Sequence, residues 1–283
     1  MQAAEQFERM AQGPDEGIDL VRGALLIAAE EYPDLDPDVY IQTLEEFAAT
    51  LRRRLRPDIG PADSVRALNR YMFDELGFHG ATQNYYDPRN SFLNDVVERR
   101  IGIPITLSVL LLEVGSRVGI RLEGVGFPGH FLVRVLGCAD DHLLDPFFGG
   151  RPIGYDELRE RLRAFYAASG APPGGNLQRA LPQALQATGN LGILSRILGN
   201  LLAIYRERDA HEQALATVEL LLLLAPDAAE YVRLRGLLYE QLECFASALA
   251  DFRRYLTIAP DTRAAAEIRT HLERLAGVTS TLH

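Results

Sequence analysis

The sequence holds only two cysteines, Cys138 and Cys244, in 283 residues. Two isolated cysteines form neither a disulfide framework nor the ligand set of a zinc site. His142 and Asp145 fall on opposite faces of a predicted strand, so they do not make a metal pair. We therefore predict no bound metal and no cofactor.

The chain also lacks lysine, so arginine supplies all 29 basic residues against 39 acidic ones. The net charge of −10 repels phosphate backbones, which argues against direct nucleic-acid binding. The densest basic cluster is Arg52-Arg53-Arg54 with Arg56, and a solvated helix face explains it more simply than a nucleic-acid site. Nucleic acid is not a predicted partner.

No apolar run reaches the length of a membrane-spanning helix, since Leu220 to Ala225 is the middle of a longer predicted helix. Residues 1–9 show no basic stretch followed by an apolar core, so no secretory signal is visible. We expect a soluble, cytoplasmic protein without a membrane partner. The sequence leaves the oligomeric state open.

The hydrophobic content of 47% is enough for one large domain or two ordinary ones. The first hundred residues predict helices, because apolar residues recur there at steps of three and four. This spacing occurs in the segments 18–28, 40–55 and 65–76. Ser91 is well placed to cap a further short helix that ends at Val97.

The middle of the chain predicts a helix followed by strands. Pro104 suits the first turn of a helix, and Gly119 is a suitable stop after it. Strand-like runs follow at 121–125, 130–136 and 142–144. They predict a small antiparallel sheet over about 121–146, packed on the helix.

Glycine and proline are concentrated at 169–176, which predicts a linker between a first part, 1–168, and a helical second part, 177–283. In the second part Ala225-Pro226-Asp227 recurs 34 residues later as Ala259-Pro260-Asp261, with Tyr205 and Tyr239 in the same register. This is the period of tetratricopeptide repeats. Two repeats fall short of the roughly three that stacking requires. We expect the helix after Asp261 to cap one end and the first part to cover the other.

The order of elements in the middle of the chain is that of a Cys-His-Asp acyl-transfer site. Such a site needs a thiolate at a helix start, a histidine that takes its proton and a carboxylate that orients the histidine. His130 and Asp145 supply the last two groups, but Pro104 occupies the helix start. Cys138 lies in a turn beyond the histidine strand and Cys244 within a repeat, so neither replaces the missing nucleophile.

Hydroxyl and polar groups surround this helix start. Thr106, Ser108 and Ser91 are alternative nucleophiles for a histidine base, although such hydroxyls more often satisfy backbone groups at helix starts. A polar loop precedes the helix and either lines a pocket or hydrogen-bonds itself. Its candidate binding residues are Tyr85, Tyr86, Asp87, Asn90 and Asn94.

Residues 85–94, 102–108, 124–131 and 145–147 resemble transglutaminase-like proteins of the SirB type, and the resemblance continues into the repeats at 235–239. It covers nearly the whole chain. It implies an α+β, mostly helical fold: a transglutaminase-like (papain-like) core with a helical N-terminal part and C-terminal tetratricopeptide repeats. His130 and Asp145 match the family's histidine and aspartate, whereas Pro104 falls near the position of the cysteine in its active enzymes. A related domain occurs in some F-box proteins of ubiquitin ligases.

These observations favour a non-catalytic protein that binds a protein or peptide segment, with His130 and Asp145 as a remnant dyad. On the repeats we expect Tyr205, Arg235 and Tyr239 to contribute to the binding surface. An acyl-transfer or amide-hydrolysing enzyme with a hydroxyl nucleophile near His130 is the alternative. A regulator that binds DNA directly is the weakest hypothesis, because no DNA-binding motif is recognisable.

Overall fold

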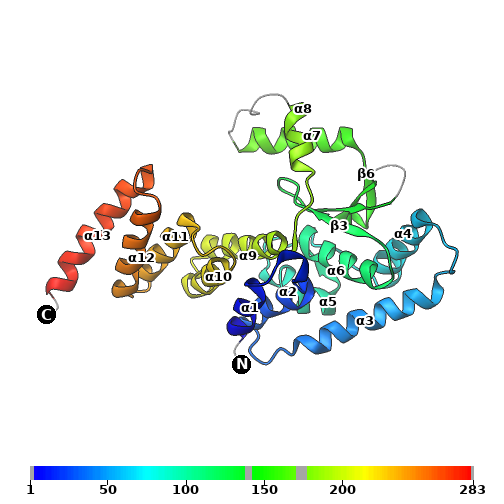
Figure 1. Cartoon of the computed structure of the whole chain (residues 1–283), viewed down its shortest axis with the longest axis horizontal. Helices are drawn as coiled ribbons and strands as arrows, with labels where there is room; N and C mark the ends of the chain where they lie inside the picture. Colours follow the sequence, from blue (N-terminus) through cyan, green and yellow to red (C-terminus); the bar gives the residue numbers. More distant parts are fainter. Residues whose placement is uncertain (1–2, 138–141, 170–176, 282–283) are drawn as a thin grey trace. The chain divides into compact units, whose positions relative to one another are not determined.

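The computed structural model describes residues 3–137, 142–169 and 177–281. The chain forms two compact units. Pro14–Ile197 contains the sheets and is called the sheet unit below, whereas Met1–Gly13 and Leu198–His283 form the helical repeat unit (Figure 1). The α+β, mostly helical fold predicted from the sequence is thus confirmed.

Helices make up most of the sheet unit. They are α2 (Leu20–Ala29), α3 (Pro37–Arg54), α4 (Pro61–Asn69), α5 (Leu93–Arg99), α6 (Pro104–Arg117), α7 (Tyr155–Ala168), α8 (Leu177–Ala184) and the beginning of α9 (Asn190–Glu207). The three helices predicted from apolar spacing correspond to α2, α3 and α4. The third is shorter than predicted, because a wider π-helical turn, Arg70–Glu75, follows α4.

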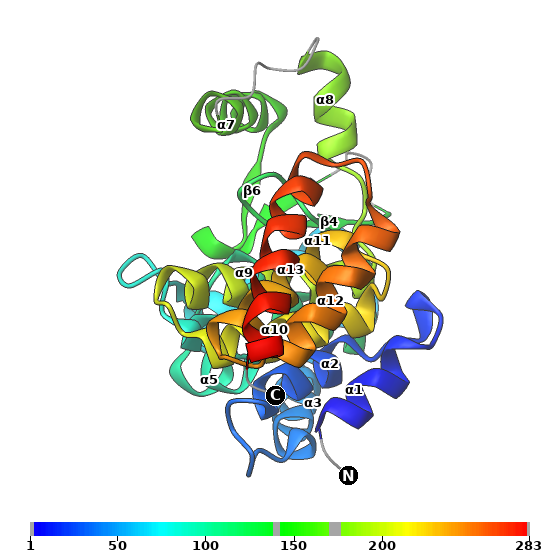
Figure 2. The same ribbon diagram turned by 90° about the vertical axis from the view of Figure 1, so that its left-hand side faces the viewer.

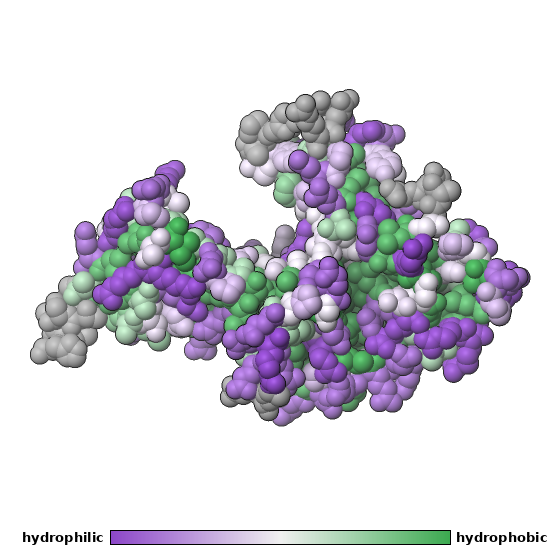
Figure 3. Space-filling view, in the orientation of Figure 1, coloured by the Kyte–Doolittle hydropathy of each residue, from purple (hydrophilic) through white to green (hydrophobic). Residues whose placement is uncertain are grey.

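The start of α3 shows how local sequence defines these helices. The Asp36 carboxylate accepts a hydrogen bond from the backbone N–H of Asp38, and Pro37 occupies the first helical position. The buried residues of α3 are Leu44, Ala48 and Leu51. Hydrophilic side chains line its outer edge (Figure 3), as expected for an amphipathic helix.

The sheet unit contains a four-stranded antiparallel sheet in the order β3 (Leu122–Val125), β4 (Leu132–Val135), β5 (His142–Asp145) and β6 (Arg151–Ile153). The predicted sheet therefore gains β6 as an edge strand. Helix α6 packs against β3 and β4. Apolar side chains of α7 and α8, which lie side by side (Figures 1 and 2), join those of the strands in one core cluster. A short parallel pair, β1 (His79–Gly80) and β2 (Ile101–Gly102), lies apart from this sheet.

The strand predicted over 130–136 is shorter in the structure. β4 begins at Leu132, which pairs with Val125, so the residues between them form the connection. The backbone N–H of His130 donates to the Phe127 carbonyl at 2.9 Å, and Gly129 has a φ of +69°. His130 therefore lies in a turn before β4, outside the strand, whereas the sequence predicted that the strand begins at His130.

The sheet unit extends beyond the predicted linker, of which residues 170–176 lie outside the described residues. After α8 the chain returns to the sheet edge, where the Thr188 N–H donates to the Gly124 carbonyl at 2.8 Å. Asp15 then accepts hydrogen bonds from the backbone N–H groups of Asn190 and Leu191 at the start of α9. These contacts hold the segment before Leu198 in the sheet unit, so the division between the units falls inside α9. The linker itself stays a prediction.

The repeat unit contains α1 (Ala3–Ala11), the remainder of α9, α10 (His211–Leu224), α11 (Ala229–Gln241), α12 (Phe245–Ile258) and α13 (Arg263–Thr281). Helix α12 begins and ends 34 residues after α10, which is the period read from the sequence. Helix α13 packs on α12, and α1 packs on α10 with Phe7 fully buried. The N-terminal helix thus belongs to the repeats, although the sequence analysis placed it with the first part. No helix in the described ranges is long and apolar enough to cross a membrane.

Candidate functional site

The structure brings the side chains of His130 and Asp145 together. His130 lies in the turn before β4, and Asp145 ends β5, the neighbouring antiparallel strand. Nε2 of His130 lies 2.8 Å from Oδ1 of Asp145. The Asp145 side chain is completely buried, whereas that of His130 is 13% exposed. The carboxylate is therefore an inner partner for a ring that reaches the surface.

The second carboxylate oxygen of Asp145 forms an ion pair with Arg161. Arg161 on α7 places Nη1 3.0 Å from Oδ2, so the buried carboxylate is paired on both sides. Arg161 also donates to Glu157 at 2.7 Å, and Nη1 of Arg151 donates to the same carboxylate at 3.0 Å. The hydrogen bonds from Arg151, the largest cause, and from Arg161 hold the pKa of Glu157 below its ordinary value. The dyad is thus braced by a network that reaches α7 and β6.

The pairing through Nε2 determines what His130 offers on its other side. An ionised carboxylate only accepts hydrogen bonds, so we assign the proton of the neutral ring to Nε2. Nδ1 is then an acceptor, and among the described residues no donor is hydrogen-bonded to it. In a Cys-His-Asp site this second nitrogen takes the proton of the nucleophile. Here it can accept a hydrogen bond from a ligand.

Pro104 opens α6 as predicted, and the two hydroxyls that follow it point into the backbone. The Thr106 hydroxyl donates to the Asn90 carbonyl at 2.9 Å and accepts from the Ile103 N–H at 3.1 Å. The Ser108 hydroxyl donates to the Pro104 carbonyl at 2.7 Å. Both side chains are fully buried. They therefore stabilise the start of α6 and its contact with the preceding loop.

Ser91 does not cap α5 as the sequence predicted. The N-cap position is Phe92, and within the described residues the buried Ser91 hydroxyl has no hydrogen-bond partner. Asn94, in the first turn of α5, is also buried. Asn90 is 1% exposed and donates through Nδ2 to the Asn84 carbonyl at 2.9 Å. These side chains shape the loop from within, so they do not form its outer surface.

The two tyrosines of the polar loop are its exposed part. Tyr85 is 38% and Tyr86 63% exposed, with their ring centroids 5.3 Å apart. Asp87 instead turns back on the loop and accepts hydrogen bonds from the backbone and guanidinium of Arg89. These hydrogen bonds from Arg89 lower the pKa of Asp87.

The rings of Phe147 and Phe148 contact His130, and those of Tyr85 and Tyr86 continue from Phe147. These four rings are called the aromatic face below. Phe147 lies 6.0 Å from Tyr85 and 6.2 Å from His130, between ring centroids. Phe148 stacks on His130 at 6.4 Å and is 49% exposed. The two phenylalanines are not among the site residues predicted from the sequence. Their position directly after the Asp145-Pro146 pair is the signal that could have found them.

Arg196 is a further residue of the site that sequence reasoning missed. It lies on α9, after the predicted linker, in a stretch that the sequence assigned to the repeats. Its Nη2 donates to the carbonyls of Phe127 and His130 at 2.8 and 2.6 Å. Arg196 thus fixes both ends of the turn that carries His130. No pattern in the local sequence around Arg196 predicts this long-range contact.

The remaining cysteine and repeat residues lie elsewhere. Cys244 is exposed in the repeat unit, and Cys138 lies outside the described residues. Tyr205 is 7% exposed, so its ring packs inside the repeats and not on their surface. Arg235 forms a two-pronged ion pair with Asp251 at 2.7 Å for each contact. The Tyr239 hydroxyl donates to Glu219 at 2.9 Å; burial, with this hydrogen bond, raises its pKa to about 12.

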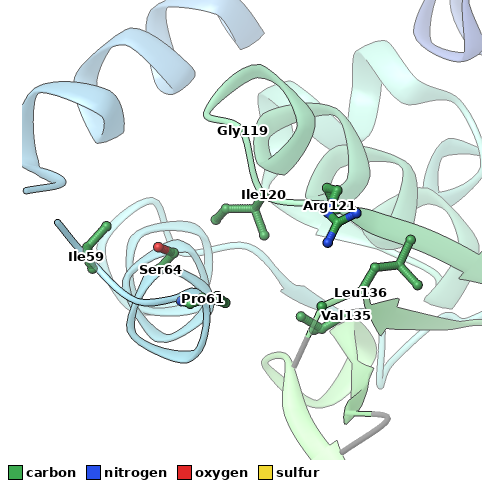
Figure 4. A pocket seen from close by; sticks show the side chains of 9 residues that line it. Ile59, Pro61, Ser64, Gly119, Ile120, Arg121, Val135 and Leu136 are labelled. Atoms are coloured by element: carbon green, nitrogen blue, oxygen red, sulfur yellow. The ribbon is translucent and has the colours of Figure 1, made fainter. Parts of the chain in front are cut away.

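A separate hollow of about 190 Å³ lies between the start of α4, the turn after α6 and the end of β4 (Figure 4). Ile59, Ile120, Val135 and Leu136 are among its apolar lining residues. The hydroxyl of Ser64 donates to the Gly60 carbonyl, and Arg121 is the charged residue that lines the hollow. None of the predicted site residues lines this hollow.

Comparison with known proteins gives the class of the chain. It belongs to the transglutaminase-like superfamily, whose family model matches residues 38–199, and a tetratricopeptide-repeat family matches residues 201–273. The predicted combination of a transglutaminase-like core with C-terminal repeats is therefore confirmed.

Among individual relatives, a UPF0162 protein of Xylella fastidiosa (strain Temecula1) is 43% identical over 95% of this chain and 94% of that protein. A UPF0162 protein of Vibrio cholerae is 28% identical over 92% of this chain and 94% of its own length. Human F-box only protein 21 is 31% identical over 62% of this chain but only 28% of its own length. No solved structure matches the chain.

Proposed function

We propose that the protein is a non-catalytic binding protein whose sheet unit holds a peptide segment against the aromatic face around His130. The observation that carries this proposal is the combination of Pro104 at the start of α6 with an intact His130–Asp145 pair. Proline has no nucleophilic side chain and no N–H. The pair then serves to present an acceptor nitrogen beside exposed aromatic rings.

The hydrogen bonds of the hydroxyl groups near the start of α6 support a non-catalytic function. A serine or threonine nucleophile must be within hydrogen-bond reach of its histidine base. Thr106 and Ser108 are buried and bonded to backbone carbonyls, so either would have to leave α6's first turns to reach a substrate. Ser91 is buried as well.

The aromatic face supports a peptide as the ligand. Large exposed rings bury much apolar area at a low entropic cost, and tyrosine adds a polar hydroxyl. Nδ1 of His130 accepts a hydrogen bond from a backbone N–H of the ligand. The repeats of the second unit provide a further surface of a kind that generally mediates protein interactions. The net charge of −10 still disfavours nucleic acid.

A displayed library of random linear peptides tests this proposal. Peptides selected on the intact protein should bind about tenfold more weakly to Tyr86→Ala and to Phe148→Ala, the loss typical of a truncated aromatic anchor. Tyr155→Ala is the matched control, because Tyr155 is a 47% exposed tyrosine outside the aromatic face. Fluorescence anisotropy of labelled peptides gives the dissociation constants.

Two results would contradict the proposal. One is a library that yields no peptide, or peptides that the aromatic variants bind as well as the native protein does. The other is labelling of Ser91, Thr106 or Ser108 by a serine- and threonine-directed activity probe that disappears in His130→Ala. That labelling would establish the hydroxyl-nucleophile enzyme instead.

A further inference from the structure

Arg196 keeps part of its hydrogen-bonding capacity free for a ligand. A guanidinium carries five N–H donors, of which the Nη2 pair is used on the carbonyls of Phe127 and His130. The group lies 5.8 Å over the ring of Phe131. Nη1 lies over Gly126, where a Cβ atom would approach it to 3.4 Å. The cation is therefore fixed in place by the turn that carries His130.

Arg196 differs from three other arginines near the aromatic face, each of which has an acidic partner. Arg89 pairs with Asp87, Arg151 with Glu157, and Arg161 with Asp145. Within the residues that the structure describes, Arg196 makes no ion pair with an acidic side chain. Burial lowers the pKa of Arg196, and the titratable group that opposes this shift is the Tyr85 hydroxyl of the aromatic face. A partly desolvated cation without an acid is costly, and an anionic ligand would relieve that cost.

We infer that the peptide held at the aromatic face presents a side-chain carboxylate to Arg196, so that the protein selects acidic segments. This inference rests on the proposed function and adds the chemistry of the ligand. A carboxylate on Arg196 makes charge-assisted hydrogen bonds, while neighbouring side chains of the same peptide pack on Tyr85 and Phe148. Because the whole chain carries a net charge of −10, the attraction is local and does not come from the overall field.

The test uses the peptides selected from the random library on the intact protein. They should be enriched in aspartate and glutamate. Replacement of the critical Glu by Gln in a synthetic peptide should weaken binding to the native protein about tenfold or more, the value of a charge-assisted hydrogen bond. With Arg196→Gln the Glu and Gln peptides should bind alike. Arg163→Gln, an exposed arginine of α7 in the same unit, should leave the difference unchanged.

The outcomes separate the two proposals. Peptides that bind through the aromatic face without acidic enrichment, or a Glu-to-Gln loss that persists in Arg196→Gln, overturn the role of Arg196 and leave the proposed function standing. A library that yields no peptide overturns the proposed function and this inference with it. If Arg196→Gln does not fold, Arg196→Lys replaces it: lysine keeps the charge but not the planar guanidinium, so the Glu-to-Gln difference should shrink, and an unchanged difference would overturn the role of Arg196.

Discussion

Asp145 shows at the scale of single residues what the pair with His130 contributes to the fold. Its carboxylate is fully buried and accepts from His130 on one oxygen and from Arg161 on the other. Such a group joins the end of β5 to α7 and to the turn before β4. The same atoms that would orient a catalytic histidine therefore also stabilise the sheet unit.

Asp145→Ala should destabilise the protein by about 2 kcal/mol, because it leaves the N–H of His130 without its acceptor and removes the buried partner of Arg161, which keeps only Glu157. Urea unfolding followed by circular dichroism measures the change. Asp156→Ala is the control, since Asp156 forms a comparable pair with Arg159 but its side chain is 96% exposed; we expect no measurable effect there. Equal effects of both changes would contradict the structural role of the buried pair.

At the scale of helices and strands, the repeat unit offers a comparison between two glycines. Gly236 on α11 lies against α12, and a Cβ atom there would come within 2.7 Å of the Phe252 ring. Gly199 on α9 has no atom within 4 Å of the corresponding point. Both sit in helices, where alanine is intrinsically the better residue.

Gly199→Ala should therefore stabilise the repeat unit by about 0.5 to 1 kcal/mol through helix propensity alone. Gly236→Ala should destabilise it by about 1 to 3 kcal/mol, because the added methyl group overpacks the contact with Phe252. Thermal unfolding of the two variants and the native protein measures whether each change raises or lowers the stability. A gain in stability from Gly236→Ala would show that α11 and α12 are not in close contact at this point.

The regular elements were the part of the fold that sequence reasoning could predict. Apolar spacing predicted α2, α3 and α4, and the recurrence of Ala-Pro-Asp predicted the 34-residue offset of α10 and α12. The exact ends of strands were less predictable. His130 lies outside β4 because the pairing of β4 with β3 stops at Leu132. A pattern of alternating residues does not reveal where the partner strand ends.

Contacts between distant segments could not be predicted for a different physical reason. The sequence showed the pair of His130 and Asp145, because both lie in adjacent elements with a recognisable order. Arg196 reaches the same turn from 66 residues further along the chain. Its contact depends on how the segment after α8 returns to the sheet edge, which no local propensity encodes.

At the scale of the whole molecule, the N-terminal helix links the two ends of the sequence in one unit. α1 lies at the beginning of the chain, yet it packs on α10, and Phe7 is fully buried there. A stack with only two repeats has little apolar surface of its own to bury. We therefore expect α1 to be a required part of the repeat unit and not an appendage of the sheet unit.

Phe7→Ala should lower the stability of the repeat unit by about 3 kcal/mol, the usual cost of removing a buried phenylalanine ring. Hydrogen exchange monitored by mass spectrometry should show faster exchange in α10 and its neighbours, while β4 keeps its native protection. Faster exchange in β4 by the same factor would mean that the two units unfold together. Unchanged exchange in α10 would contradict the packing of α1 on it, because a void beside that helix must weaken its hydrogen bonds before those of the sheet.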